Sequence, residues 1–185
     1  MSSTAALELW DTIARDAIAE SSLWCDALRP EAEREREPVF SPLAEERFAL
    51  GLETIYEGYL VHYGTPRLFA PADEDTALLL GDYLYAHGLV RIAACGIVDA
   101  VADLSELISL CSQLRAEEAE GDGALWAATA SLLASGEKLD APRAALRLRA
   151  DAAPLDAAAR AAAGAEAVER SLALHRRRLH LRFLG

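Results

Sequence analysis

Apolar residues recur every three or four positions along most of this 185-residue chain, as they do on one face of an α-helix. No segment sustains the strict apolar–polar alternation that is typical of a half-buried strand. Alanine, leucine, glutamate and arginine, which favour helices, are abundant. We therefore predict an all-α helical bundle, a single domain over residues 1–185 with six or seven helices and one short helical turn. The expected segments are 4–20, 23–28, 42–62, 73–94, 97–114, 125–134, 142–150 and 155–183.

Several boundaries follow from the residues that interrupt the apolar pattern. Ser41 and Pro42 suit the N-cap and first turn of the helix that ends near residue 62, and Gly64–Pro66 suits its end. The acidic residues 73–75 precede the next apolar run, and a helix N-terminus favours negative charge. Residues 31–38 alternate in charge sign and are expected to form a charged linker.

Two segments in the middle of the chain carry a more specific pattern. Residues 53–64 read ETIYEGYLVHYG, and residues 77–86 read ALLLGDYLYA. Together they make residues 52–114 resemble the core of the all-α isoprenyl (polyprenyl) diphosphate synthases. In that family a helix ending in His and an Asp-rich motif precedes a helix with a Leu-x-Gly-Asp-Tyr/Phe-Leu signature, which residues 80–84 match. The resemblance implies a truncated isoprenoid-synthase fold.

The Asp-rich motif itself is missing. Tyr63, Gly64 and Arg67 stand where the family has three aspartates, and no two aspartates are adjacent anywhere in the chain. In the family these carboxylates hold magnesium ions, which neutralise the charge that develops on the departing diphosphate. The resemblance therefore implies a small non-catalytic subunit or a degenerate relative that lacks both Asp-rich motifs. We assign no catalytic residue, no metal ligand and no cofactor, and favour a protein that is not an enzyme.

Two functions of different kinds remain open. In the first, the chain is a regulatory or structural subunit of a heterodimeric long-chain prenyl diphosphate synthase, in the biosynthesis of isoprenoid or quinone side chains, with a catalytic Asp-rich chain as its partner. In the second, it pairs with itself as a helical module that encloses an apolar, prenyl-like ligand without catalysis. Residual activity with a rearranged metal site at Asp73, Glu74, Asp75 or Asp82 is a third, less favoured interpretation. The candidate groove or interface residues are Tyr59, His62, Tyr63, Asp82, Tyr83 and His87.

Charge narrows the choice of partners. The net charge of −12 opposes nucleic-acid binding, which needs lysine and arginine at the phosphates. The distribution is uneven, because residues 1–120 hold 23 acids and 8 bases, whereas residues 170–185 hold five arginines and no acid after Arg170. The basic C-terminal helix end complements a helix dipole, and peripheral contact with an acidic partner or a membrane surface is the alternative. No apolar run is long enough to cross a bilayer, and three unpaired cysteines favour a cytoplasmic protein.

Overall fold

The computed structural model describes residues 3–179, and within that range the regular structure is helical. The predicted all-α fold is thereby confirmed. None of the described helices combines the length and the apolar character needed to cross a membrane. Three short 3-10 turns lie at Glu31–Glu33, Ser41–Leu43 and Glu46–Phe48. The α-helices are α1 (Ser3–Glu20), α2 (Ser22–Ala27), α3 (Ala49–Tyr63), α4 (Glu74–Ala93), α5 (Val98–Ala116), α6 (Asp122–Ser131), α7 (Asp140–Arg149), α8 (Ala153–Ala163) and α9 (Ala165–Leu179).

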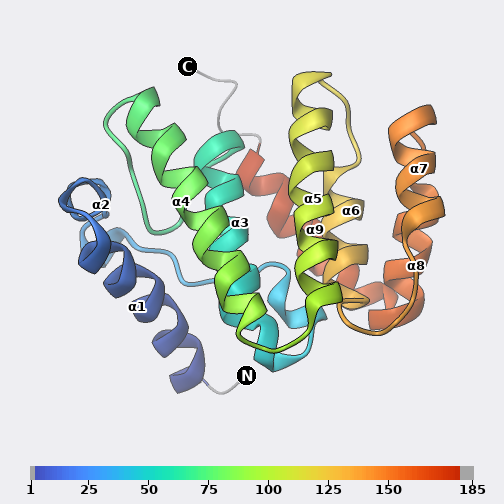
Figure 1. Ribbon diagram of the computed structural model, residues 1–185, viewed down its shortest axis with the longest axis horizontal. Coiled ribbons are helices and arrows are strands. Elements are labelled where there is room, and N and C mark those ends of the chain that lie inside the picture. Colours follow the sequence, from blue (N-terminus) through green and yellow to red (C-terminus); the bar gives the residue numbers. More distant parts are fainter. Residues whose placement is uncertain (1–2, 180–185) are drawn as a thin grey trace.

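Helix α3 is the centre of the bundle. Figure 1 shows α1 and α2 on one side of the α3–α4 pair and α6, α7 and α8 on the other. One apolar core, which includes Trp10 and Leu84, lies towards α1, and a larger core, which includes Leu104 and Trp126, lies towards α5 and α6. Because α3 contributes to both cores, twelve of its fifteen residues are buried. Its polar side chains therefore need partners inside the protein.

The closest helix packing joins α3 to α4 in an antiparallel pair (Figure 1). Gly51 faces Gly88 and Gly58 faces Gly81, so the glycines are seven residues apart on both helices. A Cβ atom on Gly58 would lie 2.9 Å from the carbonyl oxygen of Gly81, which is backbone and has little freedom to move. The absence of side chains at these four positions thus allows the two backbones to approach. Gly81, the glycine of the family-like signature, has a packing role here.

The boundaries of α4 agree with the sequence. Asp73 is the N-cap, and its Oδ1 accepts the backbone N–H of Thr76 at 2.7 Å. This hydrogen bond lowers the pKa of the Asp73 carboxyl. Gly96, at φ +78°, follows the helix and adopts the left-handed conformation that glycine tolerates best. The acidic residues 73–75 therefore act at a helix start, as predicted.

The predicted start of the third helix at Ser41 and Pro42 is wrong, although its end near residue 62 agrees with the structure. That segment forms a 3-10 turn, Ala44 and Glu45 are extended, and α3 begins only at Ala49. The reason is long-range, because the carboxylate of Glu53 accepts the backbone N–H groups of Val39 and Ser41 at 3.1 and 3.0 Å. These bonds hold the chain in a conformation that local propensity alone does not indicate.

The predicted continuous helix over residues 155–183 is also wrong within the described residues. Gly164, at φ +86°, ends α8, and α9 starts at the next residue. Arg160 pairs with Asp156 one turn earlier in α8 at 2.7 Å, and it connects α8 to α9 through an ion pair with Glu169 at 3.1 Å. The break turns α9 so that its buried face contacts α3 and α6. The last four predicted positions, residues 180–183, lie outside the described residues.

Candidate functional site

The first polar feature is an ion cluster inside the bundle, which we call the α3 ion cluster: Glu53, Glu57 and Arg67. Arg67 Nη1 lies 2.6 Å from Glu53 Oε2, and Arg67 Nε lies 2.9 Å from Glu57 Oε2. All three side chains are fully buried. The second oxygen of Glu57 accepts the backbone N–H groups of Arg67 and Leu68 at 2.8 and 2.7 Å. Each carboxylate therefore neutralises Arg67 and also fixes a loop.

Aromatic rings complete the surroundings of Arg67. Its guanidinium lies 4.4 Å from the centre of the Trp10 ring and 5.0 Å from that of Tyr56, in cation–π geometry. Burial alone lowers the pKa of Arg67, but the adjacent charges of Glu53 and Glu57 outweigh it and raise the pKa. Arg67 therefore stays charged, and it ties α1, α3 and the loop after α3 together.

A second buried group, which we call the Asp122 network, joins four helices: Tyr56 and Tyr59 of α3, Arg115 of α5, Asp122 of α6 and His175 of α9. Asp122 Oδ2 accepts hydrogen bonds from Tyr59 and Arg115 and lies 3.2 Å from His175 Nε2. Arg115 Nε also donates to the Tyr59 hydroxyl at 2.9 Å. At the other end of the network, the Tyr56 hydroxyl lies 2.9 Å from His175 Nδ1.

The order tyrosine, histidine, aspartate is one that enzymes use to activate a hydroxyl group. Here the hydroxyl of Tyr56 is fully buried, and burial raises its pKa far above the ordinary value. Burial also raises the pKa of Asp122, but hydrogen bonds from His175 and Tyr59 and the charge of Arg115 outweigh it and lower the pKa. The network thus holds a stable carboxylate and protonated tyrosines, an arrangement suited to fixing helices.

The predicted groove residues fall into two groups, one of Tyr59, Tyr63, His62 and Asp82 and one of Tyr83 and His87. Tyr59 belongs to the Asp122 network, where its ring contacts those of Tyr56, Tyr63, Trp126 and His175. Since Tyr59 is fully buried among these rings, the space beside it is filled by packed side chains.

His62 and Asp82 belong to the first group and lie at the crossing of α3 and α4. His62 Nε2 lies 3.3 Å from Asp82 Oδ1, and the Asp82 side chain is 67% exposed. The Tyr63 ring lies 5.5 Å from the His62 ring and 5.3 Å from the Tyr59 ring, centre to centre, and the Tyr63 hydroxyl donates to Ser112 Oγ of α5 at 3.3 Å.

Tyr83 and His87 form the second group, on the side of α4 that faces α1 and α2. The Tyr83 hydroxyl lies 2.8 Å from His87 Nδ1, and the Tyr83 ring stacks on Trp24 with 5.7 Å between centres. Burial, followed by the charge of Arg91, lowers the pKa of His87. The six predicted residues therefore do not surround one common groove.

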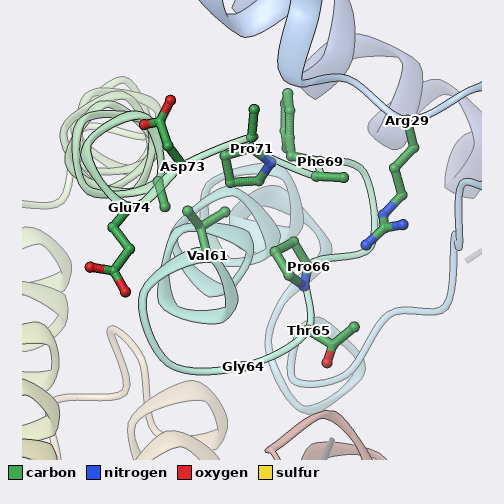
Figure 2. Close-up of a pocket in the computed structure, with 12 residues that line it drawn as sticks. Arg29, Val61, Gly64, Thr65, Pro66, Phe69, Pro71, Asp73 and Glu74 are labelled. Carbon is green, nitrogen blue, oxygen red and sulfur yellow. The ribbon is translucent and has the colours of Figure 1, made fainter. Parts of the chain in front are cut away.

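A surface pocket of about 420 Å³ opens between the end of α2, the end of α3 and the start of α4. Val61 and Phe69 contribute to its apolar lining. Figure 2 shows Arg29 on the opposite side of the pocket from Asp73 and Glu74. The volume falls in the range of small-molecule sites. Its charged residues are of opposite sign, so they indicate neither an anion nor a cation as ligand.

The acidic residues considered for a rearranged metal site do not converge. Asp73 caps α4, and Asp82 lies beside His62 more than two turns further along the helix. Over residues 3–179, no three His, Cys, Asp or Glu side chains are grouped as a metal site requires.

Helix α4 has an unusual solvent-facing side, which we call the α4 outer face: Leu78, Leu79, Asp82, Ala86, Val90 and Ala93. These positions share one side of the helix, opposite the buried Leu80, Leu84 and Gly88. Leu78, Leu79 and Val90 are 56%, 55% and 65% exposed. Val98, at the start of α5, adds a fourth large apolar side chain nearby in sequence. Of the seven exposed large apolar residues in the described chain, these four fall within residues 78–98.

Sequence reasoning missed both buried groups. Glu53 and Glu57 carried a signal, because two carboxylates one turn apart in an otherwise apolar helix are uncommon unless they are paired. The Asp122 network carried none, since His175 lies 53 residues from Asp122. The α4 outer face had a signal as well: the run from Ala77 to Leu80 is apolar around the whole helix, so part of it must face solvent or a partner.

The basic end of α9 is largely paired. Arg178 is buried and holds Glu35 through both guanidinium nitrogens Nη1 and Nη2, at 3.0 and 2.5 Å. Arg176 lies 2.7 Å from Glu169. Arg182 lies outside the described residues, and contact with an acidic partner or membrane through this end stays a prediction.

Comparison with known proteins does not add a family. No protein-family model matches the chain, and no curated protein or solved structure matches it. The relationship to the isoprenyl diphosphate synthases therefore stays a prediction from residues 52–114.

Proposed function

We propose that this chain is a non-catalytic subunit of a heteromeric long-chain prenyl diphosphate synthase and acts by binding the Asp-rich catalytic chain. The observation that carries the proposal is the structure of the connection after α3. Tyr63 donates to Ser112, Gly64 ends the helix, and Arg67 is buried between two glutamates. These three positions correspond to the aspartates of the family motif. A partner must supply the carboxylates that magnesium needs.

The packing of α3 against α4 agrees with this proposal. His62, which precedes the missing motif, occupies the space beside Gly81, and any side chain at Gly81 would collide with its ring. The two segments that carry the resemblance are therefore neighbours in space, which supports the proposal. The exposed apolar residues of α4 provide a surface for association.

The homodimeric alternative, with an apolar ligand enclosed beside Tyr59, receives less support. Tyr59 is fully buried, and four rings surround it at centre-to-centre distances of 5.3 to 5.9 Å. The pocket of about 420 Å³ lies at the start of α4 instead.

The test is reconstitution with the Asp-rich prenyl diphosphate synthase chain encoded in the same genome. The two chains are purified separately, and elongation of a labelled allylic diphosphate is measured for each chain and for the mixture. We expect long products only from the mixture, with the two chains eluting together in gel filtration. The proposal is wrong if the Asp-rich chain alone gives the same products at the same rate, or if this chain alone turns over the substrate.

A further inference from the structure

The α4 outer face has a one-sided charge pattern. The acidic residues on or beside it are Asp73, Glu74, Asp75, Asp82 and Asp99, and all five are exposed. Between residues 68 and 114 the chain contains a single arginine and no lysine. That residue, Arg91, donates to Asp16 Oδ2 at 2.7 Å and to Thr54, and its side chain is only 11% exposed. The face therefore combines apolar side chains with negative charge that no lysine or arginine of α4 offsets, and within the described residues Asp82 has only His62 beside it.

This pattern disfavours a second copy of the chain as the occupant. If two α4 helices met in parallel, Asp82 would lie opposite Asp82 of the other copy. If they met antiparallel, residues 73–75 of one copy would approach Asp99 of the other. Both arrangements bring like charges together, and like-charge contacts across an interface are costly. No base of α4 is free to compensate, since Arg91 is already engaged.

We propose that the α4 outer face docks a helix of a different protein, one whose apolar face is flanked by lysine or arginine. Leu78, Leu79 and Val90 would supply the apolar contact, and Ala86 and Ala93 would let the partner helix approach closely. Asp82 and the acids at the start of α4 would face the basic side chains of the partner. This inference rests on the proposed function and names the surface and the chemistry of the partner.

The apolar contribution is tested by measuring the affinity for the purified Asp-rich prenyl diphosphate synthase chain by isothermal titration calorimetry. The test variant is the double substitution Leu79→Ser, Val90→Ser, and the control is Leu148→Ser, an exposed leucine on α7 at 75% exposure. We expect binding at least tenfold weaker for the double variant and unchanged for the control, because the double variant removes apolar surface that the partner would bury. Circular dichroism establishes that both variants are folded.

The charge contribution is tested with the double substitution Asp75→Lys, Asp82→Lys. At about 50 mM salt we expect at least tenfold weaker binding, and at about 500 mM salt a smaller difference from the unmodified chain, because salt screens exposed charges. If the charge-reversed chain binds as well as the unmodified chain at both salt concentrations, the inference that the partner helix is basic is wrong.

The remaining outcomes separate this inference from the proposed function. Formation of an active complex that Leu79→Ser, Val90→Ser leaves unchanged would overturn the docking surface and leave the subunit function standing. A chain that dimerises alone, and that the same substitutions make monomeric in sedimentation, would identify a second copy as the occupant and overturn the inference. A lack of binding by the unmodified chain would overturn the proposed function and this inference with it.

Discussion

Helices α3 and α4 lie side by side and place their exceptional residues in opposite ways. Helix α3 carries two buried glutamates that pair with a buried arginine, whereas α4 exposes two leucines and a valine on its outer face. Every charged group of the α3 ion cluster has a charged partner, and Glu53 and Glu57 also accept backbone hydrogen bonds. The exposed leucines and valine of α4 are apolar and have no hydrogen bonds or ion pairs of this kind within the described bundle. The difference separates the residues that hold the fold from those available to another molecule.

Physical costs explain why the two exceptions have different meanings. A buried charge is tolerated only when it is paired and hydrogen-bonded. The α3 ion cluster meets this condition within the chain itself, so we interpret it as a structural element and not as a ligand site. An exposed apolar side chain destabilises the folded chain little. When a partner removes that side chain from water, its burial stabilises the complex. We therefore expect a partner to bind at the α4 outer face, and we expect the α3 ion cluster to stabilise the bundle.

The largest expected effect on stability, and the strongest test of this comparison, comes from removal of the central cation, Arg67. Arg67→Met leaves the carboxylates of Glu53 and Glu57 buried without a counter-ion, and we expect a loss of about 3–5 kcal/mol in the free energy of unfolding. Urea denaturation followed by circular dichroism measures it. The matched control is Arg170→Ala, which removes an exposed arginine paired with Glu166 and should have little effect. Equal stability of the two variants would show that the buried cluster is not structural.

The Asp122 network should contribute less, and in a pH-dependent way. Asp122→Asn keeps the shape of the side chain but removes the charge that Arg115 and His175 face, and we expect a loss of about 2–3 kcal/mol at pH 7. The pKa of Asp122 is lower in the folded protein than its ordinary value of 3.8. Its contribution is therefore present above that value and is lost as the pH falls towards the folded pKa.

The pH dependence gives this prediction a sharper form. Between about pH 5 and pH 3, the difference in unfolding free energy between the unmodified chain and Asp122→Asn should narrow by about 1 kcal/mol. Glu35 and Glu169, whose pKa values are lowered by hydrogen bonds from Arg178 and Arg176, are present in both chains and cancel in the difference. A difference that is constant across this range would mean that Asp122 is not the titrating group.

The elements that local pattern determines were predictable from the sequence. The start of α4 at the acidic residues and its end before Gly96 both follow from short-range chemistry. The start of α3 was not predictable from local pattern, because it depends on the carboxylate of Glu53, which accepts hydrogen bonds from the backbone of Val39 and Ser41. The break at Gly164 lies in an alanine-rich stretch where propensity favours a continuous helix, and the ion pair between Arg160 and Glu169 joins residues on either side of that break.

The candidate site was harder to predict from the sequence, because it too depends on contacts between residues far apart in the chain. Tyr59, His62 and Tyr83 were singled out together because they are close in the sequence and aromatic or titratable. On neighbouring helices, however, such residues point in different directions, so Tyr59 reaches Asp122 while Tyr83 reaches His87. The apolar character of α4 was visible in residues 77–80, but which of these leucines faces outward depends on the glycine contacts that orient α4 on α3.

The smallest expected effect on stability tests the other side of the comparison. Leu79 and Leu80 are adjacent on α4, with Leu79 55% exposed and Leu80 fully buried. We expect Leu80→Ala to lower the unfolding free energy by about 2–5 kcal/mol, because it leaves a cavity in the core. Leu79→Ala should stay within about 0.5 kcal/mol of the unmodified chain, as is usual for exposed positions. Thermal and urea unfolding of the isolated chain measure both. A large loss for Leu79→Ala would mean that the α4 outer face is covered within the chain itself and is not available to a partner.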